Sequence, residues 1–184
     1  ISELTIGVIG AGRIGGRLIR RLSRLGSPKI LVNDLLMNDK IAPEIKLEWV
    51  SKEELYRRCD VISLHLPLTN ATTSMIKTKQ LKMMHEDVIL VNTARGGIIN
   101  EHDLHEFLTH NPSAHACVDV FEEEPYLGPL TNLHNTTLTA HMGSMTDDCR
   151  ARMEIEACEE AARFAMGINY LNPVPEHEYL SKDK

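Results

Sequence analysis

The stretch Val8-Ile9-Gly10-Ala11-Gly12-Arg13-Ile14-Gly15 decides the fold. It follows an apolar, β-branched segment, Thr5 to Ile9, and opens a predicted helix, Arg13 to Leu25. Apolar residues recur in this helix at helical spacing and are expected to form a buried stripe that packs on the sheet: Ile14, Leu18, Leu22 and Leu25. A strand, a glycine turn and a helix in this order are typical of a dinucleotide-binding unit. Its glycines allow a tight turn, close approach of a pyrophosphate and close helix packing. Free N–H groups at the helix N-terminus favour phosphate binding.

An acidic residue stands where a ribose would need one. Asp34 comes about 20 residues after the last glycine, directly behind a second apolar segment, Ile30 to Asn33. Its carboxylate can accept hydrogen bonds from a ribose diol and would repel a 2′-phosphate. The sequence therefore predicts NAD as the cofactor in preference to NADP. The structural alternative is a glycine-rich turn beside a surface aspartate.

Apolar segments alternate with amphipathic ones along nearly the whole chain, which predicts α/β class and a doubly wound, mostly parallel sheet with helices on both faces. Helix-capping residues predict further helices after Ser51, Asn100 and Thr146, the last running towards Gly167. Besides Thr5 to Ile9, the predicted strands are Ile30 to Asn33, Leu47 to Val50, Val61 to Leu64, Val88 to Asn92, His115 to Val120 and Thr136 to Thr139.

Composition restricts the classes of partner. The 184 residues suit a single dinucleotide-binding domain, with a core over about 5–167 and an extended tail over 168–184. A net charge of −6 disfavours binding to nucleic acid or anionic membranes, and no run of 18 apolar residues predicts a membrane span. Arginines do recur along the first predicted helix, where a solvated face is favoured over a nucleic-acid patch: Arg13, Arg17, Arg20, Arg21 and Arg24.

The four cysteines form no CxxC pair. Reduced thiols in a cytoplasmic protein are therefore favoured over a disulfide framework or a zinc site. His102 and His105 stand three residues apart and could share a helix face, but no acidic or thiol partner at metal-ligand spacing accompanies them. A solvated face is therefore favoured, and no metal site is predicted.

Three polar residues follow predicted strands: Arg95, Glu124 and His141. The carboxyl ends of parallel strands border a common crevice, so these side chains are expected to converge there. A guanidinium can bind a carboxylate through two parallel hydrogen bonds, and imidazole suits proton transfer near neutral pH. Taken singly, each residue has a plainer interpretation, as a helix-flanking ion pair, a loop acid or a strand-end polar residue.

Five signatures, in order, resemble the D-isomer-specific 2-hydroxyacid dehydrogenases over about residues 5–165. The first is the glycine stretch quoted above. The others are His65-Leu66-Pro67-Leu68-Thr69, Val91-Asn92-Thr93-Ala94-Arg95-Gly96-Gly97-Ile98-Ile99, Val118-Asp119-Val120-Phe121-Glu122-Glu123-Glu124-Pro125 and Thr139-Ala140-His141-Met142-Gly143-Ser144.

The resemblance implies a Rossmann-type sheet of about six or seven strands and a role for each catalytic residue. Arg95 would bind the substrate carboxylate and polarise the keto oxygen. His141 would take the proton of the substrate hydroxyl in oxidation and return it in reduction. Glu124 would hydrogen-bond His141, fix its tautomer and raise the pKa of the imidazole. The resemblance also implies a set of cofactor-binding residues: Gly10, Gly12, Arg13, Ile14, Gly15, Asp34, Leu66, Pro67, Thr93, Ala94, Arg95, Asp119, His141, Gly143 and Ser144.

The implied function is that of the NAD-binding catalytic domain of an oxidoreductase acting on a D-2-hydroxy acid or 2-keto acid, such as 3-phosphoglycerate or hydroxypyruvate. Relatives in the family usually carry a second, substrate-binding domain, which is expected to be absent from this chain. The isolated domain is therefore expected to have little or no activity. A homodimer is also expected. The alternative is a nicotinamide-responsive regulatory module with relic dehydrogenase residues.

Overall fold

The computed structural model describes residues 1–26 and 28–173. They fall into two compact units, one spanning Ile1–Ala140 and the other starting at His141. The predicted extended tail, 168–184, lies mostly outside the described residues.

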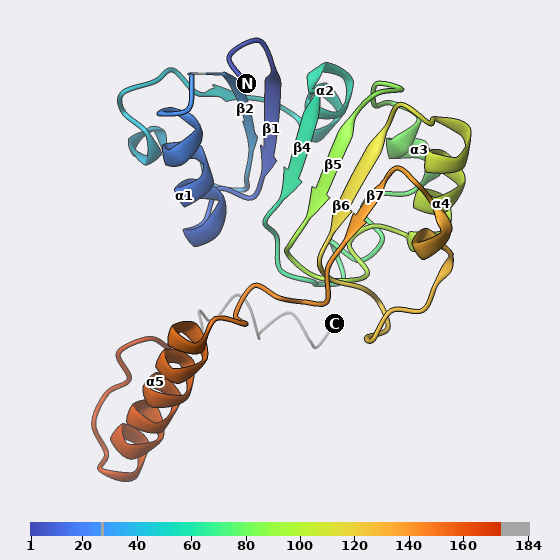
Figure 1. Cartoon of the computed structure of the whole chain (residues 1–184). Helices are drawn as coiled ribbons and strands as arrows, with labels where there is room; N and C mark the ends of the chain where they lie inside the picture. Colours follow the sequence, from blue (N-terminus) through green and yellow to red (C-terminus); the bar gives the residue numbers. More distant parts are fainter. Residues whose placement is uncertain (27, 174–184) are drawn as a thin grey trace. The chain divides into compact units, whose positions relative to one another are not determined.

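The first unit is built on a seven-stranded sheet in which all neighbouring strands are parallel (Figure 1). The strand order β3-β2-β1-β4-β5-β6-β7 means that the chain moves from the centre to one edge, returns, and moves to the other edge. This confirms the predicted doubly wound sheet. The strands are β1 (Thr5–Ile9), β2 (Lys29–Asn33), β3 (Glu48–Trp49), β4 (Val61–Leu64), β5 (Ile89–Asn92), β6 (His115–Val118) and β7 (Thr136–Leu138).

Helices cover both faces of this sheet. Ile6 and Val8 on β1 belong to the same buried cluster as Ile19 and Leu22 of α1. Ile9 belongs instead to the cluster that contains the buried residues of α2, α3 and α4. A Cβ on Gly7 would lie 2.6 Å from Leu55 Cδ2, so α2 packs closely on β1. The helical segments of this unit are α1 (Arg13–Leu22), η1 (Asp39–Ile41), α2 (Lys52–Arg58), α3 (Thr78–Leu81), α4 (Glu101–His110) and η2 (Pro129–Asn132).

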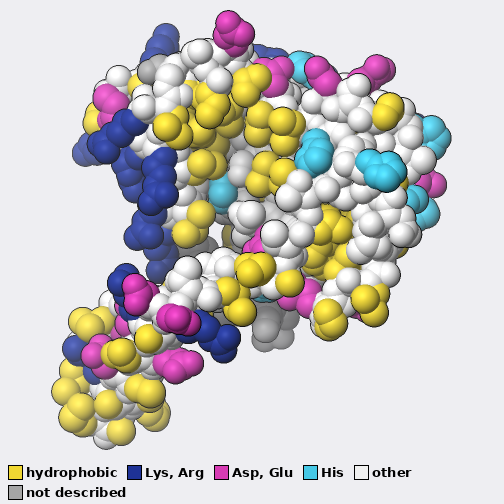
Figure 2. Space-filling view, in the orientation of Figure 1, with side chains coloured by type: hydrophobic (Ala, Val, Ile, Leu, Met, Phe, Trp, Pro, Cys, Tyr) yellow, Lys and Arg dark blue, Asp and Glu magenta, His cyan; other side chains and the backbone are white. Residues whose placement is uncertain are grey.

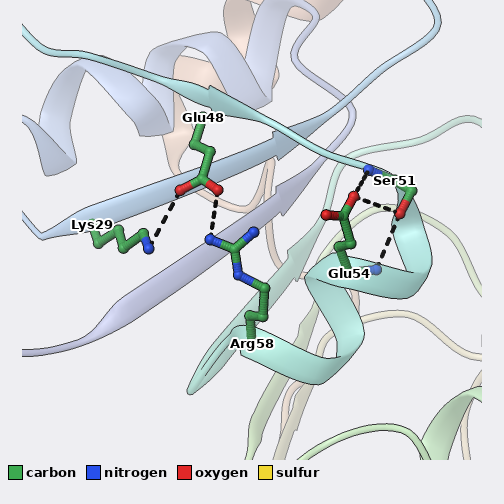
Figure 3. Close-up of polar contacts among 5 residues, drawn as sticks. All are labelled: Lys29, Glu48, Ser51, Glu54 and Arg58. Carbon is green, nitrogen blue, oxygen red and sulfur yellow. Dashed lines mark hydrogen bonds and ion pairs between the residues drawn. The ribbon is translucent and has the colours of Figure 1, made fainter.

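The predicted capping residues begin their helices. Ser51 Oγ accepts a hydrogen bond from Glu54 N, and the Glu54 carboxylate accepts one from Ser51 N in return (Figure 3). These bonds satisfy backbone donors that have no partner within the first turn. Asn100 caps α4 with its side chain, whose Oδ1 accepts a hydrogen bond from Asp103 N.

A small ion-pair network holds the edge strand β3. The Glu48 carboxylate lies 2.5 Å from Arg58 Nη2 on α2 and 3.3 Å from Lys29 Nζ on β2 (Figure 3). The hydrogen bond from Arg58, supported by Lys29, lowers the pKa of Glu48. The two strands β2 and β3 and the helix α2 are thereby joined at this edge of the sheet.

The predicted buried stripe of α1 was wrong at two positions. Ile14 is 60% exposed and Leu25 is 55% exposed, and the helix ends at Leu22 instead of Leu25. The face towards the sheet contains Gly15, Ile19 and Leu22. Gly15 packs so closely on the preceding turn that it fixes which side of the helix faces the strands, and this turns Ile14 outward.

The arginines of α1 form a solvated face, as predicted. Arg13, Arg17, Arg20 and Arg21 on the helix, and Arg24 just after it, are all exposed, and Figure 2 shows basic side chains along this edge of the first unit. Within the described residues, no helix is both long and apolar enough to cross a membrane.

The second unit contains α5 (Asp147–Ala165), which begins at the predicted cap, Thr146, and is followed by Gly167 at a φ of 68°. No residue of α5 is buried. Behind it, the Glu160 carboxylate accepts hydrogen bonds from Leu171 N and Asn172 N. The four cysteines are free.

Candidate active site at the carboxyl edge of the sheet

The loops that follow β1, β2, β4, β5 and β6 leave the sheet at the same edge, because all its strands are parallel. The chain reverses its direction between β1 and β4, and α/β sheets bind ligands at such a switch point. The first unit places the glycine turn, Asp34, Arg95, Asp119 and Glu124 on these loops.

The glycine turn fits a pyrophosphate. Gly10 has a φ of 94°, and a Cβ there would lie 2.4 Å from the carbonyl oxygen of His65. A Cβ on Gly15 would lie 1.9 Å from the carbonyl oxygen of Gly10. Both glycines are thus required by the protein itself. A Cβ on Gly12, by contrast, would meet nothing within 4 Å among the described residues, so the open space beside it is available to a ligand.

The N-terminus of α1 also suits an anion. Gly12 stands at the N-cap, no side chain of the described residues caps the helix, and its first turn carries no acidic residue. The free N–H groups and the positive end of the helix dipole therefore face the space beside Gly12. Arg13 and Ile14 are both exposed at this end.

Asp34 lies directly against the glycine turn. Its Oδ2 accepts a hydrogen bond from Ala11 N at 2.5 Å, and its Oδ1 accepts one from Leu36 N at 3.1 Å. The carboxylate is thus fixed beside the turn, with its side chain partly exposed. A carboxylate held there fits the predicted ribose contact, which stays a prediction.

The loop after β4 closes the other side of the turn. Leu66 packs against it, with Cδ2 3.0 Å from the position that a Cβ of Gly10 would occupy. His65 is partly buried beside Ser63, whose Oγ lies 2.9 Å from His65 Nε2. Burial lowers the pKa of His65. Pro67 is exposed, and its carbonyl oxygen accepts a hydrogen bond from Thr72 Oγ1.

A buried asparagine shapes the loop that carries Arg95. Asn92, 2% exposed, donates from Nδ2 to the carbonyl oxygen of Arg95 and accepts at Oδ1 from Ala94 N. Thr93 and the Arg95 side chain are exposed. The Asn92 carbonyl also accepts a hydrogen bond from Asp119 N, which ties this loop to the end of β6.

The loop after β6 carries the two predicted acids. Asp119 is 9% exposed, and its Oδ1 accepts a hydrogen bond from Thr139 Oγ1. Glu124 is exposed, and its Oε1 accepts a hydrogen bond from Phe121 N at 3.1 Å. This loop touches the Arg95 loop, because a Cβ on Gly96 would lie 1.9 Å from the carbonyl oxygen of Phe121.

His141, Gly143 and Ser144 belong to the second unit. His141 is exposed and has a φ of 52°, an uncommon conformation for a non-glycine residue. A Cβ on Gly143 would meet nothing within 4 Å among the described residues. The pairing of His141 with Glu124 stays a prediction.

Sequence reasoning missed the residues that hold these loops in place. Four residues contact the predicted site residues or their loops without having been singled out as site residues: Asn92, Gly96, Glu101 and Thr139. Asn92 alone carried a usable signal, since an asparagine that ends a strand commonly bonds the backbone two residues on. The partners of the other three are distant in sequence, so their roles depend on the folded structure.

Comparison with known proteins identifies the family. The D-isomer specific 2-hydroxyacid dehydrogenase family, NAD binding domain, matches residues 1–143. The chain belongs to this family. The predicted family, Rossmann-type fold and NAD cofactor are thereby confirmed.

Relatives show which part of such proteins the chain corresponds to. Over 165 residues it is 38% identical to glyoxylate reductase of Aeropyrum pernix, a match that covers 89% of this chain and 49% of that protein. It is 36% identical over 160 residues to hydroxypyruvate reductase of Thermotoga maritima, covering 85% and 51%. The structure of a glyoxylate reductase from Paecilomyes thermophila has a TM-score of 0.85 at 32% identity, covering 95% and 53%. The chain therefore spans about half the length of these relatives.

Proposed function

We propose that this chain is the NAD-binding half of an oxidoreductase that transfers a hydride between NAD(H) and a D-2-hydroxy or 2-keto acid. The observation that carries the proposal is the contact of Gly96 with the Phe121 carbonyl, which sets the Arg95 and Glu124 loops side by side at the same edge of the sheet as the glycine turn. Residues outside this chain would supply the substrate-binding half, in keeping with the length of the relatives. Nothing in the comparisons favours the regulatory alternative.

We propose that the residues at the glycine turn hold the cofactor. Backbone N–H groups around Gly12 would bind the pyrophosphate, and Asp34 would bind the adenosine ribose. When bound, NAD supplies or accepts the hydride. The remaining cofactor contacts proposed are Gly10, Arg13, Ile14, Gly15, Leu66, Pro67, Thr93, Ala94, Arg95, Asp119, His141, Gly143 and Ser144.

The exposed guanidinium of Arg95 would bind the substrate carboxylate through two parallel hydrogen bonds, a geometry that lysine does not reproduce. It would also polarise the keto oxygen, on which negative charge develops during reduction. Arg95 Nη1 donates a hydrogen bond to the carbonyl oxygen of Ala94, and this bond keeps the Arg95 side chain close to its own loop.

We propose His141 as the general acid and base. It would give a proton to the keto oxygen in reduction and remove it from the hydroxyl in oxidation. The Glu124 carboxylate would select the tautomer of His141 and favour its protonated form. A bond from Phe121 N already orients Glu124.

The substrate class that the proposal favours is a small 2-keto acid. Two relatives are named glyoxylate reductase and hydroxypyruvate reductase, and a single guanidinium suits a compact molecule with one carboxylate. 3-Phosphoglycerate, which carries a second anionic group, is the comparison substrate.

The experiment measures NADH oxidation by the full-length protein, and by the 184-residue chain beside it, with glyoxylate, hydroxypyruvate and pyruvate. 3-Phosphoglycerate is assayed in the opposite direction, with NAD reduction. Arg95→Ala and His141→Asn are expected to lower kcat/KM at least about 100-fold, and Glu124→Gln to shift the pH optimum. Wild-type kcat/KM in either of the first two variants would contradict the proposed roles.

Cofactor binding is tested separately by titrating NADH into the chain. Asp34→Ala is expected to weaken NADH binding about tenfold, the equivalent of about 1.4 kcal/mol, while NADPH binds more tightly to the variant than to the wild type. Unchanged affinity for both nucleotides would remove the ribose contact.

We also propose a cytoplasmic homodimer. Four free cysteines suit a reducing compartment. Exposed apolar residues on α5, among them Met153, Ile155 and Phe164, offer a surface for association. Sedimentation equilibrium of the full-length protein tests the dimer, and a monomer at micromolar concentration would contradict it.

A further inference from the structure

Gly96, in the connection between β5 and α4, and Glu101, the first residue of α4, hold one peptide group of the Glu124 loop. Gly96 lies so close to it that a Cβ would be 2.1 Å from the carbonyl carbon of Phe121 and 2.7 Å from Glu122 N. From α4, Glu101 Oε1 accepts a hydrogen bond from that same Glu122 N at 2.7 Å. The Phe121–Glu122 peptide is therefore fixed by contact on one side and by a charge-assisted hydrogen bond on another.

Glu101 is not needed to cap its own helix. It is the first residue of α4, and Asn100 already accepts a bond from Asp103 N at that terminus. The Glu101 carboxylate is instead directed to a residue about 20 positions along the chain. It bonds this distant backbone although burial raises the pKa of Glu101, and Glu122 and Glu123 nearby raise it too.

The bond reaches Glu124 through two residues. Phe121 is buried, its ring stacks on Tyr126 with 4.2 Å between ring centroids, and its N–H donates to Glu124 Oε1. Fixing Glu122 N places the Cα of Phe121. The buried, stacked Phe121 ring restricts rotation about its N–Cα bond, so the Phe121 N–H keeps its direction towards the Glu124 carboxylate.

We propose that Glu101 is a positioning residue that holds the Glu124 carboxylate in place relative to the Arg95 loop. Arg95 adjoins Gly96, and Glu101 begins the helix that follows. The segment from β5 to the start of α4 therefore carries Arg95 and also holds the loop of Glu124. The role of Glu101 in turnover rests on the proposed dehydrogenase function, whereas its contact with the Glu124 loop is independent of that function.

The first test follows amide hydrogen exchange in the 184-residue chain. Glu101→Ala is expected to speed exchange at Glu122 by about tenfold or more and to speed exchange at Phe121 as well. Glu101→Gln keeps an acceptor oxygen and should retain most of the protection at both amides. Glu53→Ala is the control, because it removes an exposed glutamate from the first turn of α2 and should change neither amide.

Unchanged exchange at Phe121 in Glu101→Ala would overturn the proposal, and so would equal exchange in the alanine and glutamine variants. The second test measures kinetics of the full-length protein with the best 2-keto acid. Glu101→Ala is expected to lower kcat about tenfold with the KM for NADH within twofold of wild type, and Glu101→Gln to recover most of kcat.

The two tests distinguish failure of the proposed dehydrogenase function from failure of the positioning role of Glu101. If the wild-type protein reduces no 2-keto acid, the proposed function fails together with the role of Glu101 in turnover, and the amide exchange still decides whether Glu101 holds the loop. If the wild-type protein is active and Glu101→Ala keeps its kcat, the positioning role of Glu101 is overturned and the dehydrogenase function stands.

Discussion

The glycine turn and the paired Arg95 and Glu124 loops meet at the same edge of the sheet but are built differently. The turn is one continuous stretch whose shape comes from backbone geometry, with Gly10 at positive φ and Gly15 packed on the Gly10 carbonyl. The paired loops are separate stretches joined by the hydrogen bond from Asp119 N to the Asn92 carbonyl oxygen and by the close approach of Gly96 to Phe121, and the buried Asn92 side chain shapes the Arg95 loop. Local sequence can specify the first design, whereas the second depends on contacts between distant residues.

The largest expected effect is on the contact between the loops. Gly96→Ala would place a Cβ 1.9 Å from the Phe121 carbonyl oxygen, so the backbone of one loop must move. We expect the free energy of unfolding to fall by about 3 kcal/mol, measured by urea denaturation. Gly12→Ala is the control: its Cβ has open space, so it should lose only about 1 kcal/mol, the cost of alanine at a helix N-cap. Equal stability of the two variants would show that the loops are not tightly joined.

The next largest effect is on NADH affinity, where we expect the substitution at Gly12 to be the damaging one. Gly12→Ala fills the space proposed for the pyrophosphate, so NADH affinity should fall about 100-fold, equivalent to about 2.7 kcal/mol. Isothermal titration of the 184-residue chain measures it. Wild-type affinity in this variant would mean that the open space beside Gly12 does not receive the cofactor.

The difference between the two regions explains what could be predicted from the sequence. Strand positions were confirmed because short apolar, β-branched runs, such as residues 88–91, are typical of strands. Helix starts at Ser51 and Asn100 were confirmed because capping depends on residues three apart. Such signals come from residues close together in the sequence, and so does the signal for the glycine turn.

What could not be predicted depends on packing. Helical periodicity placed Ile14 in the buried stripe, but the contact of Gly15 with the Gly10 carbonyl rotates the helix and leaves Ile14 exposed. The short α3 (Thr78–Leu81) was missed because four residues carry too little periodicity. Glu101 was passed over because its partner, Glu122, lies in another loop.

A smaller effect is expected from the buried asparagine. Asn92→Ala removes the donor to the Arg95 carbonyl and the acceptor for Ala94 N, both at a position 2% exposed. Leaving buried polar groups without partners should cost about 2 kcal/mol of unfolding free energy. Asn70→Ala, at an exposed turn, is the control. A loss below about 0.5 kcal/mol would indicate that the loop keeps its shape without this side chain.

The smallest effect concerns pH and the wall of the glycine turn. Burial lowers the pKa of His65 below its usual value near 6.5, so the unfolded chain binds a proton more readily than the folded one. Stability from this group is therefore complete above the unfolded pKa and declines as pH falls through about 6.5 towards the lower folded pKa. Urea denaturation at pH 7.5 and 5.5 measures the loss, which His65→Gln should reduce and the exposed-site control His134→Gln should not. An identical loss in wild type and His65→Gln would mean that His65 is protonated without cost, and that the wall around the turn is more open to water than its burial indicates.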